Sequence, residues 1–173
     1  MRTWFMCKVK YQKEDEESGL LKSVTEPYLF DAMSFTEAET RVYEELADSI
    51  RGEWLVTSIT KTKFIDVFRY DDSDIWHKCK VTYTVADGDS GKEKKVTNLM
   101  LVTAHDVKQA YERIYESLNN MLVTFRVPEV TETPIMEVFP FHGEDAELNQ
   151  EIPDNLRPLV DPESGELLEN KEG

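Results

Sequence analysis

Alternation of apolar and polar positions marks two pairs of extended segments along the chain. In residues 4–11 and 76–83, β-branched and aromatic side chains alternate with polar ones, the period-2 pattern of a strand with one buried face. Each segment runs into a polar stretch, residues 14–19 or 87–91, whose residue types favour turns. The pattern therefore predicts two hairpins, with returning strands at about 23–31 and 95–103.

A helical pattern follows each hairpin. Ser34 and Asp106 stand at N-cap positions, and Glu37 or Gln109 three residues later completes a capping box. Apolar side chains then recur every four residues, which predicts one buried stripe per helix: Ala38, Val42 and Leu46, then Ala110, Ile114 and Leu118. The charged residues between them are expected to face water: Glu39, Arg41, Glu44 and Glu45. The helices are predicted to end near Gly52 and near Asn119 and Asn120.

Long extended segments at 53–68 and 124–139 close the two patterns, with bends expected near Thr60 and at Pro134. Each half of the chain is therefore predicted to be a ββαβ unit. One helix covers only one face of such a sheet, so a single unit of this size would be marginally stable alone.

The two units are related by an internal repeat. Sliding the sequence by 72 positions aligns residues 4–49 with 76–121 at 18 identities, including Trp4 with Trp76 and Cys7 with Cys79. After a one-residue deletion the offset becomes 71, and Val56 then meets Val127. We therefore predict an α+β fold of tandem duplicated ββαβ units with pseudo-twofold symmetry.

The units are assigned to residues 1–70 and 71–140, and we expect them to form one compact domain. They could extend one mixed sheet or pack sheet against sheet. The remaining segment, 141–173, is rich in acids and prolines and is predicted to be a mostly irregular tail.

The charge is strongly negative, since 20 Lys+Arg stand against 35 Asp+Glu, a formal charge of −15. From residue 140 onward there are ten acids and two bases, or −8, which leaves −7 for the rest. This balance argues against a conventional basic nucleic-acid binder. No stretch is long and apolar enough for a membrane span or a secretory signal, so we expect a cytoplasmic protein that does not engage a membrane.

Catalytic motifs are weak in this sequence. It has no complete P-loop and no Gly-x-Ser-x-Gly elbow, and no cofactor is expected. His77 and Cys79 are two apart, and Cys7 and His105 could approach them, so a metal-dependent enzyme using His77 and His105 is an alternative. Because Cys7 and Cys79 fall on the apolar face of their strands, we interpret both as small core residues.

The opposite face of the same strands carries tryptophan and lysine in both units. A Trp beside lysines on an open sheet face can stack on a base while ammonium groups meet phosphate. The main hypothesis is therefore a non-enzymatic binding protein for a nucleotide or single-stranded nucleic acid, although each Trp could instead pack beneath the neighbouring unit or the tail. The candidate ligand-binding residues are Trp4, Lys8, Lys10, Trp76, Lys78 and Lys80.

The acidic balance supports a second hypothesis, an inhibitor that presents carboxylates to a basic protein surface in place of DNA phosphates. Homodimer formation stays open. Outside the tail, the candidate residues are Glu14, Asp15, Glu16, Glu17, Glu37, Glu44 and Glu45.

Several segments carry a resemblance to a known family. They are residues 3–9 (TWFMCKV), 24–29 (VTEPYL), 34–39 (SFTEAE) and 133–139 (TPIMEVF). Through them the chain resembles a family of small uncharacterised proteins from Bacteroidetes bacteria and their phages, over roughly residues 1–140. The resemblance implies a bacterial or phage accessory role and brings no catalytic residues.

Overall fold

The computed structural model of the chain describes residues 1–141. The predicted acidic tail, apart from its first residue, lies outside the described residues. Residues 1–139 make up one compact unit. Among residues 1–141, no helix combines the length and apolarity needed to cross a membrane.

The described residues form eight strands and two helices, an α+β fold as predicted. The elements in chain order are β1 (Thr3–Glu14), β2 (Leu21–Ala32), α1 (Phe35–Leu46), β3 (Trp54–Lys61), β4 (Phe64–Phe68), β5 (Trp76–Ala86), β6 (Glu93–Thr103), α2 (Val107–Ser117), β7 (Phe125–Glu132) and β8 (Glu137–Phe139).

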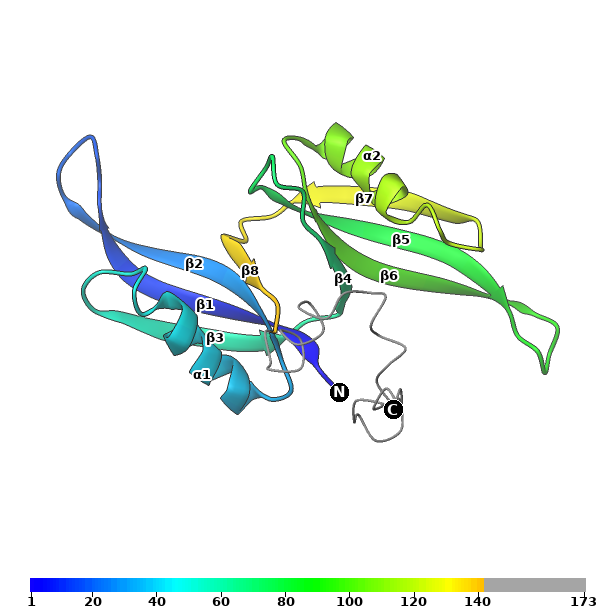
Figure 1. Cartoon of the computed structure of the whole chain (residues 1–173), viewed down its shortest axis with the longest axis horizontal. Helices are drawn as coiled ribbons and strands as arrows, with labels where there is room; N and C mark the ends of the chain where they lie inside the picture. The colour runs from blue at the N-terminus through cyan, green and yellow to red at the C-terminus, as the bar shows by residue number, and fades with distance from the viewer. Residues whose placement is uncertain (142–173) are drawn as a thin grey trace, which may run out of the picture. The chain divides into compact units, whose positions relative to one another are not determined.

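The strands form two four-stranded sheets, in the orders β3-β1-β2-β8 and β4-β6-β5-β7. In each sheet the hairpin strands and the strand after the helix are antiparallel. The fourth strand comes from the other half of the chain and pairs in parallel: β8 with β2, and β4 with β6. Figure 1 shows β8 and β4 in the middle of the molecule, between the two sheets' hairpins.

This exchange corrects the prediction of two self-contained ββαβ units. The long closing segment of each half is split in two, and its second part joins the other sheet. β3 ends at Lys61, just before Thr62, whose N–H and hydroxyl both donate to the Trp4 carbonyl, at 2.9 and 2.7 Å. Thr133 makes the same pair of bonds to the Trp76 carbonyl, both at 2.8 Å. The chain turns away from its own sheet at each threonine.

The two hairpins are closed by matching turns. Asp15 and Asp87 each accept the backbone N–H four residues later, from Gly19 and Gly91. Both glycines have φ of +66°, a conformation that a side chain would disfavour. In the second turn the Asp87 carboxylate also accepts from the Ser90 hydroxyl and from the Asp89 N–H.

The helices begin at the predicted caps. The Ser34 hydroxyl accepts from the Glu37 N–H at 3.1 Å, and the Asp106 carboxylate accepts from the Gln109 N–H at 2.7 Å. The first helix ends at Leu46, earlier than the predicted Gly52, and the chain from Ala47 to Gly52 forms turns.

The prediction that Arg41 faces water is wrong. Arg41 is 7% exposed and Arg113, its counterpart, is 9% exposed. Arg41 donates to the Asp31 carbonyl at 2.6 Å and the Phe139 carbonyl at 3.3 Å, whereas Arg113 donates to the Thr103 carbonyl at 2.9 Å. Each guanidinium donates to backbone carbonyl oxygen at a strand end, which an apolar side chain could not do.

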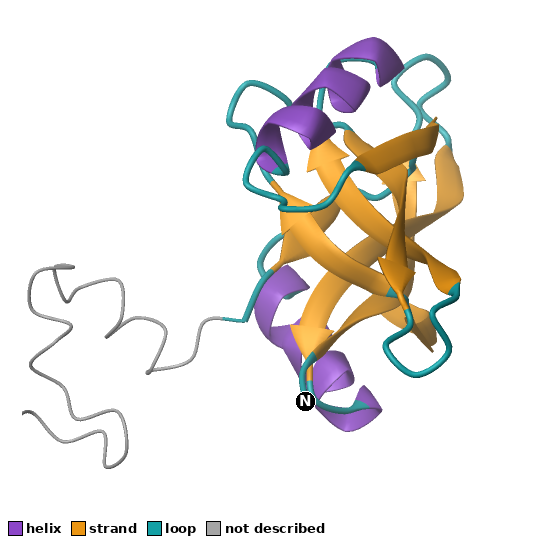
Figure 2. Ribbon diagram, turned by 90° about the vertical axis from the view of Figure 1, so that its right-hand side faces the viewer, coloured by secondary structure: helices purple, strands orange, loops and turns teal. Residues whose placement is uncertain are grey.

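The two sheets and two helices pack around three apolar cores. Each helix packs on one face of its own sheet, over cores that contain Cys7 and Val42 in one half and Cys79 and Ile114 in the other. Figure 2 shows a helix at either end of the described unit and the strands between them. We call the face of each sheet turned away from its helix its outer face. Part of the two outer faces meets in a third cluster, the inter-sheet core, formed by Leu29, Trp76, Leu101, Ile135 and Val138 with Trp4, Met6, Phe64 and Val67 around them.

Candidate ligand-binding surfaces

The two predicted stacking residues belong to the inter-sheet core. Trp76 is 1% exposed and the Arg69 guanidinium lies 5.2 Å from the centre of its ring. Trp4 is half-buried against the same cluster. A buried ring cannot stack on a ligand, so the structure corrects the assignment of Trp76 to an open face. The alternative reading, packing beneath the neighbouring half, describes where both rings lie.

The predicted lysines do lie on the outer faces, farther along the strands than the tryptophans. Lys8 and Lys10 are exposed on β1, and Lys78 and Lys80 are half-buried on β5. Lys80 pairs with Glu129 at 3.1 Å. This hydrogen bond, followed by the charges of Lys80 and Lys78, lowers the pKa of the Glu129 carboxyl. The two lysines therefore act on this carboxyl as nearby positive charges, although the Lys80–Glu129 pair is itself neutral.

A depression of about 940 Å³ lies at the far end of the first sheet, and we call it the first depression. Three aromatic side chains line it, Tyr11 on β1, Tyr43 on α1 and Trp54 at the start of β3. The Trp54 and Tyr43 rings are 4.9 Å apart at 33°. The remaining lining residues are Lys10, Gln12, Leu21, Ser23, Arg51, Gly52, Glu53 and Leu55.

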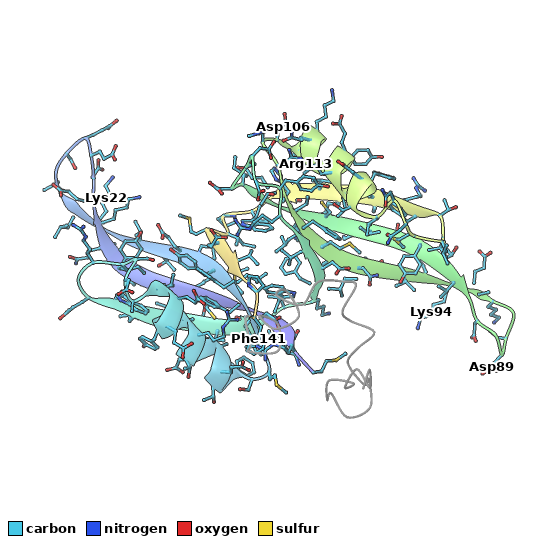
Figure 3. The ribbon with its side chains drawn as sticks, viewed as in Figure 1. Lys22, Asp89, Lys94, Asp106, Arg113 and Phe141 are labelled. Atoms are coloured by element: carbon cyan, nitrogen blue, oxygen red, sulfur yellow. The ribbon has the colours of Figure 1, made fainter. Side chains whose placement is uncertain are left out.

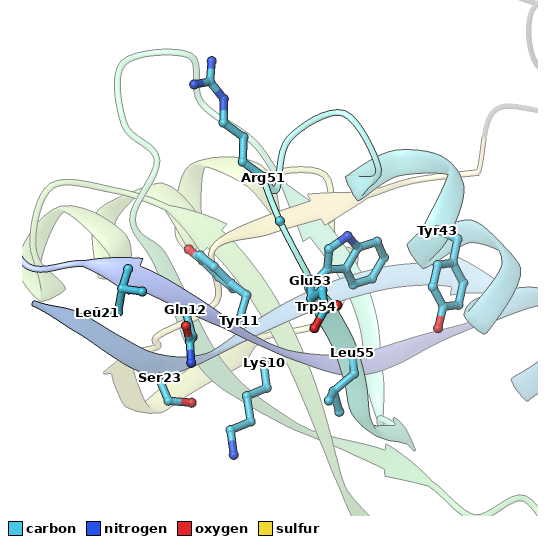
Figure 4. Close-up of a pocket in the computed structure, with 11 residues that line it drawn as sticks. Lys10, Tyr11, Gln12, Leu21, Ser23, Tyr43, Arg51, Glu53, Trp54 and Leu55 are labelled. Carbon is cyan, nitrogen blue, oxygen red and sulfur yellow. The ribbon is translucent and has the colours of Figure 1, made fainter.

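Strand alternation divides the lining of the first depression between the two sides of the sheet. Tyr11 pairs with Trp54 across the strands, and Lys10 pairs with Leu55. In Figure 4, Lys10 and Leu55 point to one side, and Trp54 and Tyr11 point to the other. Arg51 extends from the loop before β3, on the side opposite Lys10. A cation is therefore present on each side of the end of β3.

A second depression, of about 440 Å³, occupies the corresponding end of the second sheet. At offsets of 72 and 71, six of its lining residues match lining residues of the first: Thr82 with Lys10, Tyr83 with Tyr11, Thr84 with Gln12, Lys95 with Ser23, Thr124 with Glu53, and Arg126 with Leu55. Pro128 completes the lining. The two depressions therefore lie at equivalent positions of the repeat, but different types of side chain line them.

Trp54 is the functional candidate that sequence comparison passes over. At offset 71 it meets Phe125, so it has no tryptophan counterpart to draw attention to it. Its signal in the sequence is its position just after Gly52, whose φ of +82° turns the chain into β3. The same turn places the aromatic ring at the end of the sheet.

The cysteines and histidines do not come together. Cys7 and Cys79 are both fully buried, in the cores of different sheets, as core residues were predicted to be. Burial raises the pKa of each thiol to about 12. His77 is 1% exposed and its Nδ1 lies 3.2 Å from the Ile75 carbonyl, whereas the His105 side chain is 58% exposed beside Asp72. Within residues 1–141, no three His, Cys, Asp or Glu side chains are grouped to hold a metal.

Several of the carboxylates proposed for DNA mimicry have partners within the molecule. Asp15 pairs with Lys22 at 2.6 Å, Glu37 with Arg2 at 2.8 Å and Glu45 with Arg41 at 3.6 Å. Glu14, Glu16, Glu17 and Glu44 are exposed. An acidic face made of all seven would have to break internal pairs, which weakens the second hypothesis.

Fold and surface together define a two-sheet α+β protein with one depression at the far end of each sheet. Comparison with known families finds one match, to a family described as a domain of unknown function (DUF4494), over residues 3–141. The chain belongs to this family. A comparison with curated proteins finds no match.

Proposed function

We propose that the protein is a non-enzymatic binding protein that takes a phosphate-bearing aromatic base in the first depression. The base belongs either to a free nucleotide or to a single-stranded nucleic acid. The observation that carries this proposal is the combination of three aromatic rings with Lys10 and Arg51 around one open depression.

The aromatic rings suit a base because stacking on an aromatic side chain contributes about 1–3 kcal/mol per base and tolerates any base. Tyr43 is 46% exposed, and it holds the Trp54 ring from behind through their 4.9 Å contact. Tyr11 is oriented by its hydroxyl, which donates to Glu26 at 2.8 Å. The platform is therefore fixed before a ligand arrives, which lowers the entropy lost on binding.

The cations suit the phosphates. Lys10 and Arg51 lie on opposite sides of the end of β3, so a backbone that crosses this end meets one cation on each side. Glu53 is the carboxylate that lines the depression, leaving a net positive lining in a strongly acidic protein. Because exposed charges are screened within about 10 Å at 0.1 M salt, this local balance matters more than the total charge.

The proposal is tested by fluorescence anisotropy of labelled single-stranded oligonucleotides, with unlabelled mononucleotides as competitors. Trp54→Leu should weaken oligonucleotide binding at least about fivefold, the lower end of the stacking contribution. Lys10→Ala should weaken it less, by about threefold, as expected for an exposed charge. Lys61→Ala is the matched control, since Lys61 is an exposed lysine at the opposite end of β3 from Trp54, opposite Phe5, and it should leave affinity unchanged.

Competition separates the two sources of the base. A mononucleotide that competes as well as an oligonucleotide identifies the free nucleotide as the ligand. The proposal is overturned if neither probe binds saturably, or if Trp54→Leu binds as tightly as the unaltered protein. Capture of a basic protein by the exposed acids, in a salt-sensitive manner, would then support the inhibitor hypothesis instead.

The paired depressions have a common origin in this proposal, a tandem duplication of one ββαβ unit with pseudo-twofold symmetry. Support comes from contacts that recur at the repeat offsets. The inter-sheet core contains both members of four pairs of positions that are equivalent in the repeat. They are Leu29 and Leu101, Trp4 and Trp76, Phe64 and Ile135, and Val67 and Val138. The exchanged fourth strands also recur, as β8 on β2 and β4 on β6.

A further inference from the structure

The second depression differs from the first in what its lining offers a ligand. Hydroxyl groups come from Thr82, Thr84 and Thr124, and positive charge comes from Lys95 and Arg126. Its lining contains no carboxylate. Tyr83 is the aromatic residue of this lining, and its hydroxyl already accepts a hydrogen bond from the Asn98 amide at 3.3 Å.

Strand pairing brings these groups onto one patch. Thr82 on the central strand β5 stands opposite Arg126 on β7, and Thr84 stands opposite Lys95 on β6. Neighbouring strands are about 5 Å apart, so the two cations lie on either side of the two threonines. All four point to the outer face, because they alternate with Val81 and Tyr83, which face the helix side.

The nearby carboxylates do not cancel this charge. Glu129 is held by Lys80, which also lowers the pKa of its carboxyl. Glu93 stands opposite Ala86, farther out toward the hairpin tip than the pair of Thr84 and Lys95. Lys78 adds further positive charge on the same face.

We infer that the second depression is an oxyanion site, which binds a phosphate group through Lys95, Arg126 and the hydroxyls of Thr82 and Thr84 without reading a base. Compared with the first depression, it replaces Glu53 by Thr124 and Leu55 by Arg126, changes that favour an anion. Hydroxyls and cations are the donors that phosphate oxygens accept, and a planar guanidinium can meet two of them at once. The site does not depend on the function proposed for the first depression.

The test is a titration of the full chain with inorganic phosphate and pyrophosphate in chloride buffer, followed by backbone amide NMR. Saturable shifts are expected at Thr82, Thr84, Lys95 and Arg126. Lys95→Ala and Arg126→Ala should each weaken binding about threefold, and the double variant about tenfold. Both side chains are exposed, so the variants should keep the thermal stability of the unaltered protein.

Lys94→Ala is the matched control. Lys94 is also exposed and adjacent in sequence, but it faces the other side of β6, opposite Val85, and it projects from the second hairpin in Figure 3. If Lys94→Ala weakens phosphate binding as much as Lys95→Ala, the effect is general surface charge and the site is refuted. Absence of saturable shifts in the unaltered protein refutes it as well.

Trp54→Leu distinguishes this site from the first. It should leave phosphate binding unchanged, so loss of oligonucleotide binding with intact phosphate binding separates the two proposals. Tighter binding of mononucleotides than of pyrophosphate at Thr82 and Thr84 would contradict a site that ignores the base.

Discussion

The two halves of the molecule agree where they are buried and differ where they are open. At the strand ends, Thr62 and Thr133 make the same bonds to Trp4 and Trp76. At the far ends of the sheets, the first depression is aromatic and the second is hydroxylic and basic. A fold with matching interiors does not require different depressions, and the two binding roles proposed above would account for their difference.

The sharpest way to test this comparison is to remove one tryptophan from each environment. Trp76→Ala should lower the free energy of unfolding by about 3–5 kcal/mol, because it opens a cavity in the inter-sheet core. Trp54→Ala should cost less, about 1–2 kcal/mol, since the half-buried ring packs at the edge of the first core and lines an open depression. Urea denaturation followed by circular dichroism measures both. Equal losses would show that Trp54 serves packing rather than binding.

A smaller effect is expected from the paired buried arginines. Arg113→Met should cost about 1–3 kcal/mol, because the Thr103 carbonyl and Asp72 both lose their donor. Arg41→Met should cost less, because the Asp31 carbonyl still accepts from Arg2 at 2.8 Å. The same denaturation experiment gives both values. If Arg113→Met leaves the free energy of unfolding unchanged, water replaces the guanidinium. The two interiors are then less alike than their hydrogen bonds indicate.

The smallest effect concerns pH, because the side chain that reaches back over the helix start is the ionisable Glu37 in the first cap and the neutral Gln109 in the second. The Glu37 carboxylate accepts from the Met33 N–H at 2.7 Å, and the Gln109 amide oxygen accepts from the His105 N–H in the same way. The Met33 N–H, then Arg2, lowers the pKa of Glu37. A lowered pKa stabilises the fold above the unfolded value, about 4.3, and this contribution disappears as pH falls through the folded value.

Glu37→Gln should therefore destabilise the protein at pH 7, by less than about 1 kcal/mol for a partly exposed group, and should have no effect at a pH below the folded pKa. Gln109→Ala should cost a pH-independent amount. Thermal melts across this range provide the measurement, and a pH-independent difference for Glu37→Gln would contradict the role of its charge.

Local elements could be predicted from the sequence because their causes are local. Ser34 and Asp106 cap the helices through bonds to residues three positions away, and Gly19 and Gly91 close hairpins within five residues. Lys10 was placed correctly on an open face by strand alternation alone. In each of these cases the interacting groups are close in sequence, so the pattern contains the information.

The rest depended on contacts that no local pattern encodes. Strand alternation places Trp76 on the face away from the helix, but it cannot tell that the other sheet covers this face. Arg41 reads as a solvent residue in the helical pattern, and its burial follows from carbonyls on β2 and β8. The exchange of β4 and β8 likewise cannot be read from the sequence. Two similar units predict the same strands whether each closing strand joins its own sheet or the other one.

Because of the strand exchange, the first sheet cannot be completed until the ribosome has synthesised β8. The open edge of β2 ends at Ala32, but its partner β8 is finished only at Phe139, which is 139 − 32 = 107 residues later. At typical synthesis rates that interval lasts roughly 5–20 s. During this interval the edge of β2 that carries Leu29 and Phe30 has no partner strand. An unpaired edge can pair with a strand of another nascent chain on the same mRNA.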